Sequence, residues 1–204
     1  MKLYFSPHTS SLAAHIALEW IGQPFELHEV EIRPGKSPEL VARNPMGAVP
    51  VLEDAGWILT QNVAVLNYLA DRFPEAGVGS DGTPRGRAEL NRWLGFINSD
   101  LHPYFEAFFG EHGYLQDKAT IEKTVEHSRV ALRKRLALVD EHLKDRDFLL
   151  GARHSVADGY LFIVAEAATA FGVDLADLTA LLAFVARMRA DPAVQRALAA
   201  ESAA

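Results

Sequence analysis

The sequence predicts an α/β unit over residues 1–77 followed by an all-helical unit over residues 84–204. Three observations support this division. Short strand-like runs alternate with helix-like segments in the first part, whereas after residue 84 apolar residues recur only at helical spacing. A stretch rich in glycine, proline and small polar residues separates the two parts, and we place the linker at residues 78–83. A chain of 204 residues is sufficient for two domains.

The first part is predicted to have the element order β-α-β-α-β-β-α. An apolar run at residues 2–5 forms the first strand, and the helix that follows is capped by Ser10 or Ser11 and ends at Gly22. The remaining elements are a strand at 26–32, a helix at 37–43, a hairpin of strands at 49–53 and 57–59, and a helix at 62–72. Two early crossovers imply parallel strands, and the hairpin adds an antiparallel edge. This order is the plan of a thioredoxin-like domain.

The second part is predicted to be a helical bundle. Apolar residues recur at helical spacing over residues 90–101 and again over 121–143. The stretch 156–171 is apolar almost all round, so we expect it to be a buried central helix. Ser155 and Asp158 form the pattern of a capping box at its start, and we assign them to folding. Two further helices are predicted at 178–188 and 192–199.

Composition argues against several classes of partner. The net charge is −7, from 20 basic and 27 acidic residues, which does not favour a broad nucleic-acid surface. The most apolar stretch, residues 161–173, is interrupted by Glu166 and is too short to span a bilayer. The N-terminal segment lacks the apolar core of a signal peptide. We therefore expect a cytoplasmic protein that binds neither membranes nor nucleic acids.

The chain contains no cysteine, which excludes disulfides, thiolate metal sites and cysteine nucleophiles. Its eight histidines show no spacing typical of a metal-binding pair, so no metal site is expected. These two observations restrict catalysis to groups other than a thiol or a metal ion of the protein.

A hydroxyl-rich turn, residues 6–11, joins the first strand to the first helix. Free N–H groups and the positive end of the helix dipole point into such a turn, where they stabilise an anion such as a thiolate. A free thiol ionises near pH ~8.5, so ionisation near pH ~6.5 requires about 2.7 kcal/mol of preferential stabilisation. One hydroxyl donor supplies roughly 1.5–3 kcal/mol, and the helix end up to about 1–2 kcal/mol more. The alternative is that Ser10 or Ser11 only caps the helix.

Two further motifs offer polar groups to a ligand. Val49-Pro50 opens a predicted strand, which suits a sheet edge or a cis turn, and the residue before the proline presents its backbone to an extended peptide. Gln61 and Asn62 lead into the next helix, where polar side chains and free N–H groups suit a carboxylate. Asn62 is explained equally well as a plain N-cap.

The order and spacing of these pieces resemble the cytosolic glutathione transferases, most closely the bacterial beta class. The resemblance covers nearly the whole chain and is carried by the segments MKLYFSPHTSSLAAHIAL, NPMGAVPVL, LTQNVAVLNYLADRFPE, RWLGFINSDLHPYF and HSVADGYLF. It implies the glutathione transferase fold, in which a thioredoxin-like domain precedes a helical bundle. It also implies a homodimer with its two sites near the interface.

The resemblance further implies that glutathione, as co-substrate, lies along the N-terminal domain with its sulfur facing the turn after the first strand. Its cysteinyl backbone would pair beside Ala48 and Val49, before a cis-Pro50. Its γ-glutamyl carboxylate would lie at Gln61 and Asn62. The glycine carboxylate would meet a base after the second strand, for which the candidates are Lys36 and Arg33.

A hydrophobic electrophile is expected against the helical domain. His102 matches a histidine that lines the beta-class site, and Asp100 matches an acid contributed across the dimer. The electrophile pocket is expected to be lined by aromatic residues, namely Phe105, Phe108, Phe109 and Tyr114.

The sequence departs from the beta-class pattern at several of these positions. Ser10 stands where the class has its motif cysteine, and Gln61 stands where it has an acid. Asn62 replaces a small residue, Gly95 an asparagine and Pro103 a lysine.

The first departure decides the expected mechanism. Without a cysteine the protein cannot form a mixed disulfide with glutathione, so reductase cycles through an enzyme sulfur are excluded. A hydroxyl that stabilises the glutathione thiolate is the mechanism that remains. Ser10 is the first choice by position, followed by Ser11 and then by Tyr4 near the end of the first strand.

Three functions are open on this basis. The first is a detoxifying transferase that conjugates glutathione to hydrophobic electrophiles. The second is a ligand carrier on the same fold with little or no catalysis, which the departures favour. The third is glutathione-dependent peroxide reduction without an enzyme thiol.

Overall fold

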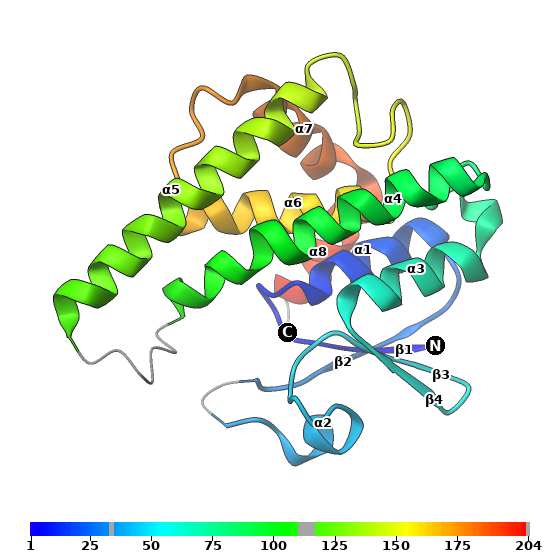
Figure 1. Ribbon diagram of the computed structural model, residues 1–204. Coiled ribbons are helices and arrows are strands. Elements are labelled where there is room, and N and C mark those ends of the chain that lie inside the picture. Colours follow the sequence, from blue (N-terminus) through cyan, green and yellow to red (C-terminus); the bar gives the residue numbers. More distant parts are fainter. Residues whose placement is uncertain (33–34, 110–116, 203–204) are drawn as a thin grey trace.

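The computed structural model describes residues 1–32, 35–109 and 117–202. A four-stranded sheet lies at one side of the molecule, and helices cover it and extend away from it (Figure 1). The strands are β1 (Lys2–Phe5), β2 (Glu26–Glu29), β3 (Val51–Asp54) and β4 (Trp57–Thr60). The helices next to the sheet are α1 (Ser11–Ile21), α2 (Pro38–Arg43) and α3 (Asn62–Arg72), followed by the 3₁₀ turn η1 (Pro74–Ala76).

The sheet has the strand order β2-β1-β3-β4. β1 pairs in parallel with β2, and β3 pairs antiparallel with both β1 and β4. The prediction of parallel strands from two crossovers is therefore right for β2 and wrong for β3. A parallel return requires a helix that carries the chain back along the sheet. The short α2 stays at one end of the sheet, so the chain re-enters from the end where β2 leaves it (Figure 1).

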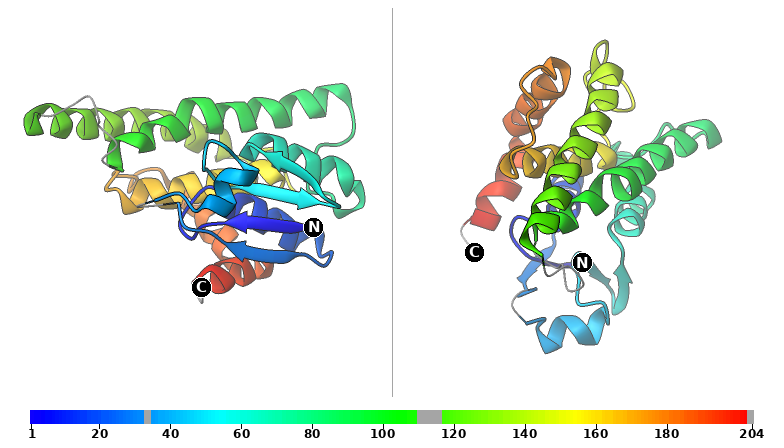
Figure 2. Two further views of the ribbon diagram at one scale, coloured as in Figure 1. Left: turned by 90° about the horizontal axis from the view of Figure 1, so that it is seen from below. Right: turned by 60° about the vertical axis from the view of Figure 1, so that its left-hand side comes forward.

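The two faces of the sheet carry different helices. Along β1, Leu3 and Phe5 belong to the large core that includes α1 and α3, whereas Tyr4 packs with Leu40 of α2 in a smaller cluster. This division follows from the two-residue period of a strand, which sends successive side chains to opposite faces. α1 and α3 thus lie on one face and α2 on the other (Figure 2).

The rest of the described chain is helical. α4 (Pro84–Phe96) continues into the π-helical turn η2 (Ile97–Leu101) and the 3₁₀ segment η3 (His102–Phe108). The later helices are α5 (Lys118–Leu143), α6 (Val156–Ala170), α7 (Thr179–Ala190) and α8 (Pro192–Ser202). The sequence predicts one helix through residue 101, but the structure changes from α-helix to π-helix at Ile97. π-helical turns are rare and frequently occur at functional sites, so this segment is of interest for the site.

α6 is the buried central helix that the sequence predicts, and it packs against α1. The predicted capping box at its start is confirmed: a carboxylate oxygen of Asp158 accepts the Ser155 N–H at 2.8 Å. The other carboxylate oxygen accepts the Leu149 N–H at 2.8 Å. The start of α6 and the segment at Leu149 are therefore joined at one buried carboxylate.

The segment between the two units is tied to the helical part. Val78 is fully buried, and its carbonyl accepts the Val156 N–H at 2.8 Å. The strand predicted at 26–32 ends at Glu29, because β1 ends at Phe5, the residue that pairs with Glu29. No helix within the described ranges has both the length and the apolarity needed to cross a membrane.

Candidate functional site

The turn between β1 and α1 holds a closed cluster of hydroxyl groups around Ser11. Ser11 is fully buried, and its Oγ lies 2.7 Å from Oγ1 of Thr9. The same Oγ lies 3.3 Å from both the backbone nitrogen and the carbonyl oxygen of Ser6. Thr9 Oγ1 also donates to the Ser6 carbonyl at 2.7 Å. Because these bonds occupy the Ser11 hydroxyl, it organises the turn and is not free for a ligand.

Ser10 occupies the N-cap position of α1 and differs from Ser11 in its contacts. Its side chain makes no capping hydrogen bond, and no other hydrogen bond of its Oγ occurs within the described residues. The expected cap is therefore confirmed in position, since Ser10 is the N-cap residue, but the Ser10 side chain does not bond to the helix N–H groups. The half-buried Ser10 hydroxyl lies at the N-terminus of an 11-residue helix, where the dipole favours an anion.

Tyr4 lies on the opposite face of the sheet from α1. Its hydroxyl donates to Oε2 of Glu53 at 3.0 Å, and the guanidinium carbon of Arg43 lies 4.5 Å from its ring centroid. Burial and the hydrogen bond to Glu53 raise the pKa of Tyr4. The structure thus separates Tyr4 from the turn, which argues against this residue as the hydroxyl beside the sulfur.

The loop before β3 presents an unpaired backbone. The Val49-Pro50 peptide bond is cis. Asn44 holds the loop, because its Nδ2 donates to the Ala48 carbonyl at 2.7 Å and its Oδ1 accepts the Met46 N–H at 3.1 Å. Within the described residues Val49 makes no backbone hydrogen bond. Its N–H and C=O are therefore available to an extended ligand.

Lys36 lies against the same loop. Its Nζ donates to the Met46 carbonyl at 2.5 Å. Its aliphatic stem crosses Gly47, where a Cβ atom would stand only 2.2 Å from Lys36 Cδ. Gly47 also has a φ of +60°, a backbone conformation that favours glycine, and a larger residue there would displace the Lys36 side chain. Lys36 thus places a cation beside the loop, whereas the other candidate base, Arg33, lies outside the described residues.

The N-terminus of α3 is built from Gln61 and Asn62. Gln61 is exposed and has a φ of 74°, a conformation that costs a non-glycine residue roughly 1–3 kcal/mol and is concentrated at functional sites. Asn62 is the first residue of the helix and is 7% exposed; its Nδ2 donates to the Ser10 carbonyl at 3.2 Å. The alternative of Asn62 as an N-cap is therefore wrong. Its Oδ1 is buried with no partner in the described chain.

His102 lies at the junction of η2 and η3 and points to the central helix. Its Nδ1 lies 2.7 Å from the hydroxyl of Tyr160, which donates to Oδ1 of Asn98 at 3.2 Å. Burial lowers the pKa of His102 and raises that of Tyr160, and hydrogen bonding by Asn62 opposes the shift of Tyr160. Asn62 therefore connects the Ser10 backbone on one side with the Tyr160 hydroxyl on the other.

The other positions around η2 are open. Asp100 and Pro103 are exposed. At Gly95, a Cβ atom would meet nothing within 4 Å, so open space takes the place of the asparagine side chain of the beta-class pattern. Asp100 is thus accessible to solvent, and a side chain at position 95 would have room.

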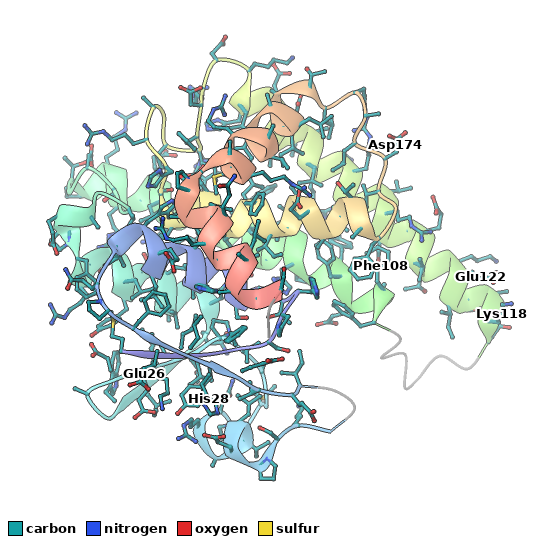
Figure 3. The ribbon with its side chains drawn as sticks, turned by 180° about the vertical axis from the view of Figure 1, so that it is seen from behind. Glu26, His28, Phe108, Lys118, Glu122 and Asp174 are labelled. Carbon is teal, nitrogen blue, oxygen red and sulfur yellow. The ribbon has the colours of Figure 1, made fainter. Side chains whose placement is uncertain are left out.

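Aromatic rings gather at the end of η3. Phe108 stacks on Phe171 with ring centroids 4.8 Å apart and an interplanar angle of 8°, and Phe109 meets Phe171 edge-on at 5.4 Å. Phe105 is buried, whereas Phe109 is 44% exposed. Figure 3 shows Phe108 at the end of the molecule away from Glu26. The remaining predicted pocket residue, Tyr114, lies outside the described residues.

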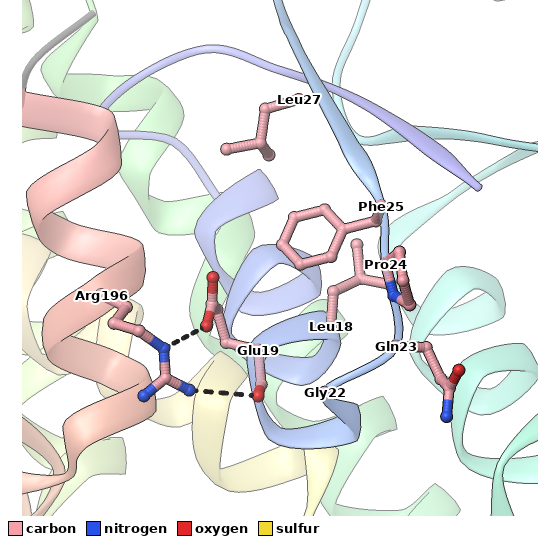
Figure 4. Close-up of a pocket in the computed structure, with 8 residues that line it drawn as sticks. All are labelled: Leu18, Glu19, Gly22, Gln23, Pro24, Phe25, Leu27 and Arg196. Atoms are coloured by element: carbon pink, nitrogen blue, oxygen red, sulfur yellow. Dashed lines mark hydrogen bonds and ion pairs between the residues drawn. The ribbon is translucent and has the colours of Figure 1, made fainter.

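A separate open pocket of about 560 Å³ lies behind α1, next to β2 and α8 (Figure 4). Phe25 and Leu27 line it, and the ion pair of Glu19 with Arg196 stands at its side. It shares no residue with the predicted site. Within the described ranges no cluster of histidine and acidic side chains is arranged to hold a metal ion.

Sequence reasoning did not identify Asn44, Asn98, Tyr160 or Phe171 as site residues. Tyr160 carried a usable signal, since a tyrosine in a helix that is apolar almost all round needs a hydrogen-bond partner for its hydroxyl. For Asn44 the sequence indicates only that it belongs to a turn. Asn98 and Phe171 carried no signal beyond their residue type.

Comparisons with known proteins agree with this arrangement. The family description "Glutathione S-transferase, N-terminal domain" matches residues 1–71, and "Glutathione S-transferase, C-terminal domain" matches residues 96–192. The glutathione S-transferase GST-4.5 of Xanthomonas campestris pv. campestris is 51% identical over 98% of each chain.

Solved structures give the same result. A glutathione S-transferase from Xylella fastidiosa superposes with a TM-score of 0.94 at 46% identity, covering 98% of each chain. A sphingomonad glutathione S-transferase in complex with glutathione superposes with a TM-score of 0.89 at 34% identity, covering 100% of each chain. The predicted fold, a thioredoxin-like domain followed by a helical bundle, is confirmed, and the chain belongs to the glutathione S-transferase family.

Proposed function

We propose that this glutathione S-transferase conjugates the glutathione thiolate to hydrophobic electrophiles, with Ser10 as the hydroxyl that stabilises the thiolate. The observation that carries the proposal is the contrast between two neighbouring serines: the Ser10 hydroxyl makes no hydrogen bond in the described chain, whereas that of Ser11 is enclosed by Ser6 and Thr9. The sulfur attacks the electrophile itself, and no enzyme-bound sulfur takes part because the chain has no cysteine.

The residues present fit glutathione. The Val49 backbone is unpaired and suits antiparallel pairing with a cysteinyl residue. Gln61 and the free N–H groups of α3 suit the γ-glutamyl carboxylate, and the orphaned Oδ1 of Asn62 suits an ammonium or amide donor beside it. Lys36 supplies a cation for the glycine carboxylate.

The electrophile is assigned to the aromatic residues of η3. Phe109 offers an exposed ring beside the stacked Phe108 and Phe171, and such rings favour planar aryl groups. His102 lies one turn before Phe105 on the same element and is assigned to the catalytic centre between the two ligands.

We further propose a cytoplasmic homodimer that serves detoxification, divided into domains at residues 1–77 and 84–204 with the linker at 78–83. Met46 and Trp57 support a dimer, because they are 69% and 50% exposed and apolar. Asp100 is exposed and would reach the site of the other copy. Light scattering coupled to gel filtration tests the assembly, and a monomer at micromolar concentration contradicts it.

The transferase proposal is tested by glutathione binding and by turnover. Calorimetry should give a glutathione Kd in the micromolar to millimolar range, and a chromogenic aryl halide should be conjugated with loss of activity in Ser10→Ala. Absence of glutathione binding at millimolar concentration contradicts the proposal.

A ligand carrier with little catalysis is the second candidate, and the open space at Gly95 favours it, because it enlarges the site without adding a catalytic group. Glutathione binding without turnover of aryl halides or of cumene hydroperoxide would support the carrier. Turnover of the peroxide alone would support glutathione-dependent peroxide reduction, the third candidate.

A further inference from the structure

We propose that Tyr160 is a positioning residue that holds neutral His102 as the Nδ1–H tautomer and so leaves the Nε2 lone pair as the free basic atom. The role of that atom in turnover rests on the proposed transferase function, whereas the tautomer itself is a property of the protein alone.

The Tyr160 hydroxyl has one proton and two lone pairs. Its proton goes to Oδ1 of Asn98 at 3.2 Å, because an amide oxygen only accepts. The contact of 2.7 Å with His102 must then use a lone pair of the Tyr160 oxygen. A lone pair accepts, so Nδ1 of His102 carries the proton that it donates.

The position of Asn62 is compatible with the same assignment. Its Nδ2 must face the Ser10 carbonyl, because that carbonyl accepts and the amide oxygen cannot donate. The second N–H of this amide is the donor that opposes the rise in the pKa of Tyr160, since a donor to the phenol oxygen favours its ionised form. A donor from Asn62 uses at most one lone pair of Tyr160, so the other lone pair remains for Nδ1–H of His102.

The electrostatics leave His102 neutral. Its burial lowers the pKa, so at neutral pH one ring nitrogen is protonated and the other is a base. Nε2 has no hydrogen-bond partner within the described residues and, unlike Nε2 of His15, is not enclosed by protein atoms. The basic atom of His102 is thus the accessible one.

The placement links His102 to the sulfur site. Ser10, Asn62, Tyr160 and His102 form a continuous chain of polar contacts from the turn after β1 to the start of η3. Under the proposed function the glutathione thiol is the acidic group that Nε2 would deprotonate. The S–H bond breaks, the proton forms an N–H bond at Nε2, and the electron pair stays on sulfur as the thiolate that Ser10 stabilises.

The tautomer is tested by nitrogen NMR on protein labelled with ¹⁵N-histidine, measured without glutathione above pH 7. The His102 signals are identified by their loss in His102→Gln. We expect Nδ1 to be the protonated nitrogen in the wild type. In Tyr160→Phe the acceptor for Nδ1–H is lost, and we expect His102 to shift toward the Nε2–H form that an imidazole prefers in water. A wild type in the Nε2–H form, or a variant with an unchanged tautomer, overturns the proposal.

Two further variants separate this effect from simple loss of packing. Tyr68→Phe removes a comparable tyrosine hydroxyl, one that donates to Asp54 at 2.6 Å, and should leave the His102 signals unchanged. Asn98→Asp keeps an acceptor for the Tyr160 proton and should keep the Nδ1–H form. A change in tautomer in either variant counts against the proposal.

Kinetics then test the role of the tautomer. Tyr160→Phe should lower kcat for aryl halide conjugation about tenfold or more while KM for glutathione changes little. Tyr68→Phe, which changes a hydroxyl outside the proposed site, should retain most of the activity. If the wild type shows the expected tautomer but no transferase turnover, the proposed function fails and the structural assignment of His102 stands.

Discussion

Nδ1 of His15 on α1 lies 2.9 Å from Oε1 of Glu201 on α8, 186 residues further along the chain, and both side chains are buried. Two other polar contacts join α1 to α8 or to Asp191, the residue before it. Trp20 Nε1 donates to Asp191 at 3.2 Å, and Arg196 pairs with Glu19 at 2.6 Å. The last helix of the chain therefore holds α1, whose N-terminus carries Ser10.

We expect Glu201→Ala to lower the free energy of unfolding by about 1–3 kcal/mol, because it leaves Nδ1 of His15 buried without a partner. Urea unfolding followed by circular dichroism measures the loss. Arg196→Ala is the matched control: its partner contact to Glu19 is partly exposed, and such pairs contribute only about 0–1 kcal/mol. Equal losses of unfolding free energy in the two variants would contradict the view that Glu201 contributes more than Arg196 to the attachment of α8 to α1.

Replacement of the two neighbouring serines should have opposite consequences. Ser10→Ala should leave thermal stability nearly unchanged and lower kcat/KM for conjugation roughly 10²-fold, a loss typical of removing one donor from a developing anion. Ser11→Ala should lower stability by about 1–3 kcal/mol, because Thr9 and Ser6 lose a buried partner. Steady-state kinetics and thermal unfolding of both variants check this. A fully active Ser10→Ala would remove Ser10 from the mechanism.

Asn44 should matter for glutathione affinity although it is not expected to touch the ligand. Asn44→Ala removes the bonds to the Ala48 carbonyl and the Met46 N–H, so the loop no longer fixes the backbone of Val49. We expect KM for glutathione to rise with kcat little changed, together with a stability loss of about 1–3 kcal/mol. Arg43→Ala on the preceding helix is the control, and an unchanged KM in Asn44→Ala would show that the loop holds its shape without it.

Asp158 should make stability depend on pH between about 4 and 6. Burial raises its pKa to about 6 from 3.8, against the hydrogen bonds that favour the carboxylate. Between these two pH values the folded protein keeps the Asp158 proton, whereas the unfolded chain has lost it. The stability contributed by protonated Asp158 is therefore fully present below pH 3.8 and is lost as pH rises to about 6.

The measurement compares the unfolding free energies of the wild type and Asp158→Asn across this window. The wild type should have the higher unfolding free energy at low pH. We expect its difference from Asp158→Asn to fall by a total of about 3 kcal/mol as pH rises. Ser155→Ala keeps the buried carboxylate and should show the same direction of change. An advantage that grows with pH would mean that the hydrogen bonds of the carboxylate outweigh its burial.

Much of the fold follows from local sequence patterns. Helical periodicity located α4, α5, α6 and α7, and the capping box located the start of α6, because these features depend on residues a few positions apart. The direction of β3 was predicted wrongly, since the spacing of elements does not reveal that the short α2 stays at one end of the sheet. The π-helical turn at Ile97 has no periodic signature of its own.

Local sequence patterns predict only part of the candidate site. The sequence drew attention to Ser10, Val49 and Asn62 because they stand at element boundaries. It left Ser10, Ser11 and Tyr4 as alternatives, because residues so near in sequence differ only in the direction of their side chains. The strand period and the hydroxyl cluster separate them: Tyr4 faces α2, and Ser11 is bound inside the turn.

The sequence by itself determined the fold class and the exclusion of any cysteine mechanism, and it predicted the turn where a thiolate would be held. These conclusions depend on composition and short-range spacing. The tertiary structure alone decided that Asn62, Asn98, His102 and Tyr160 meet around one hydroxyl. His102 and Tyr160 are 58 residues apart in the chain, and only the packing of η3 against α6 brings their side chains within a hydrogen bond.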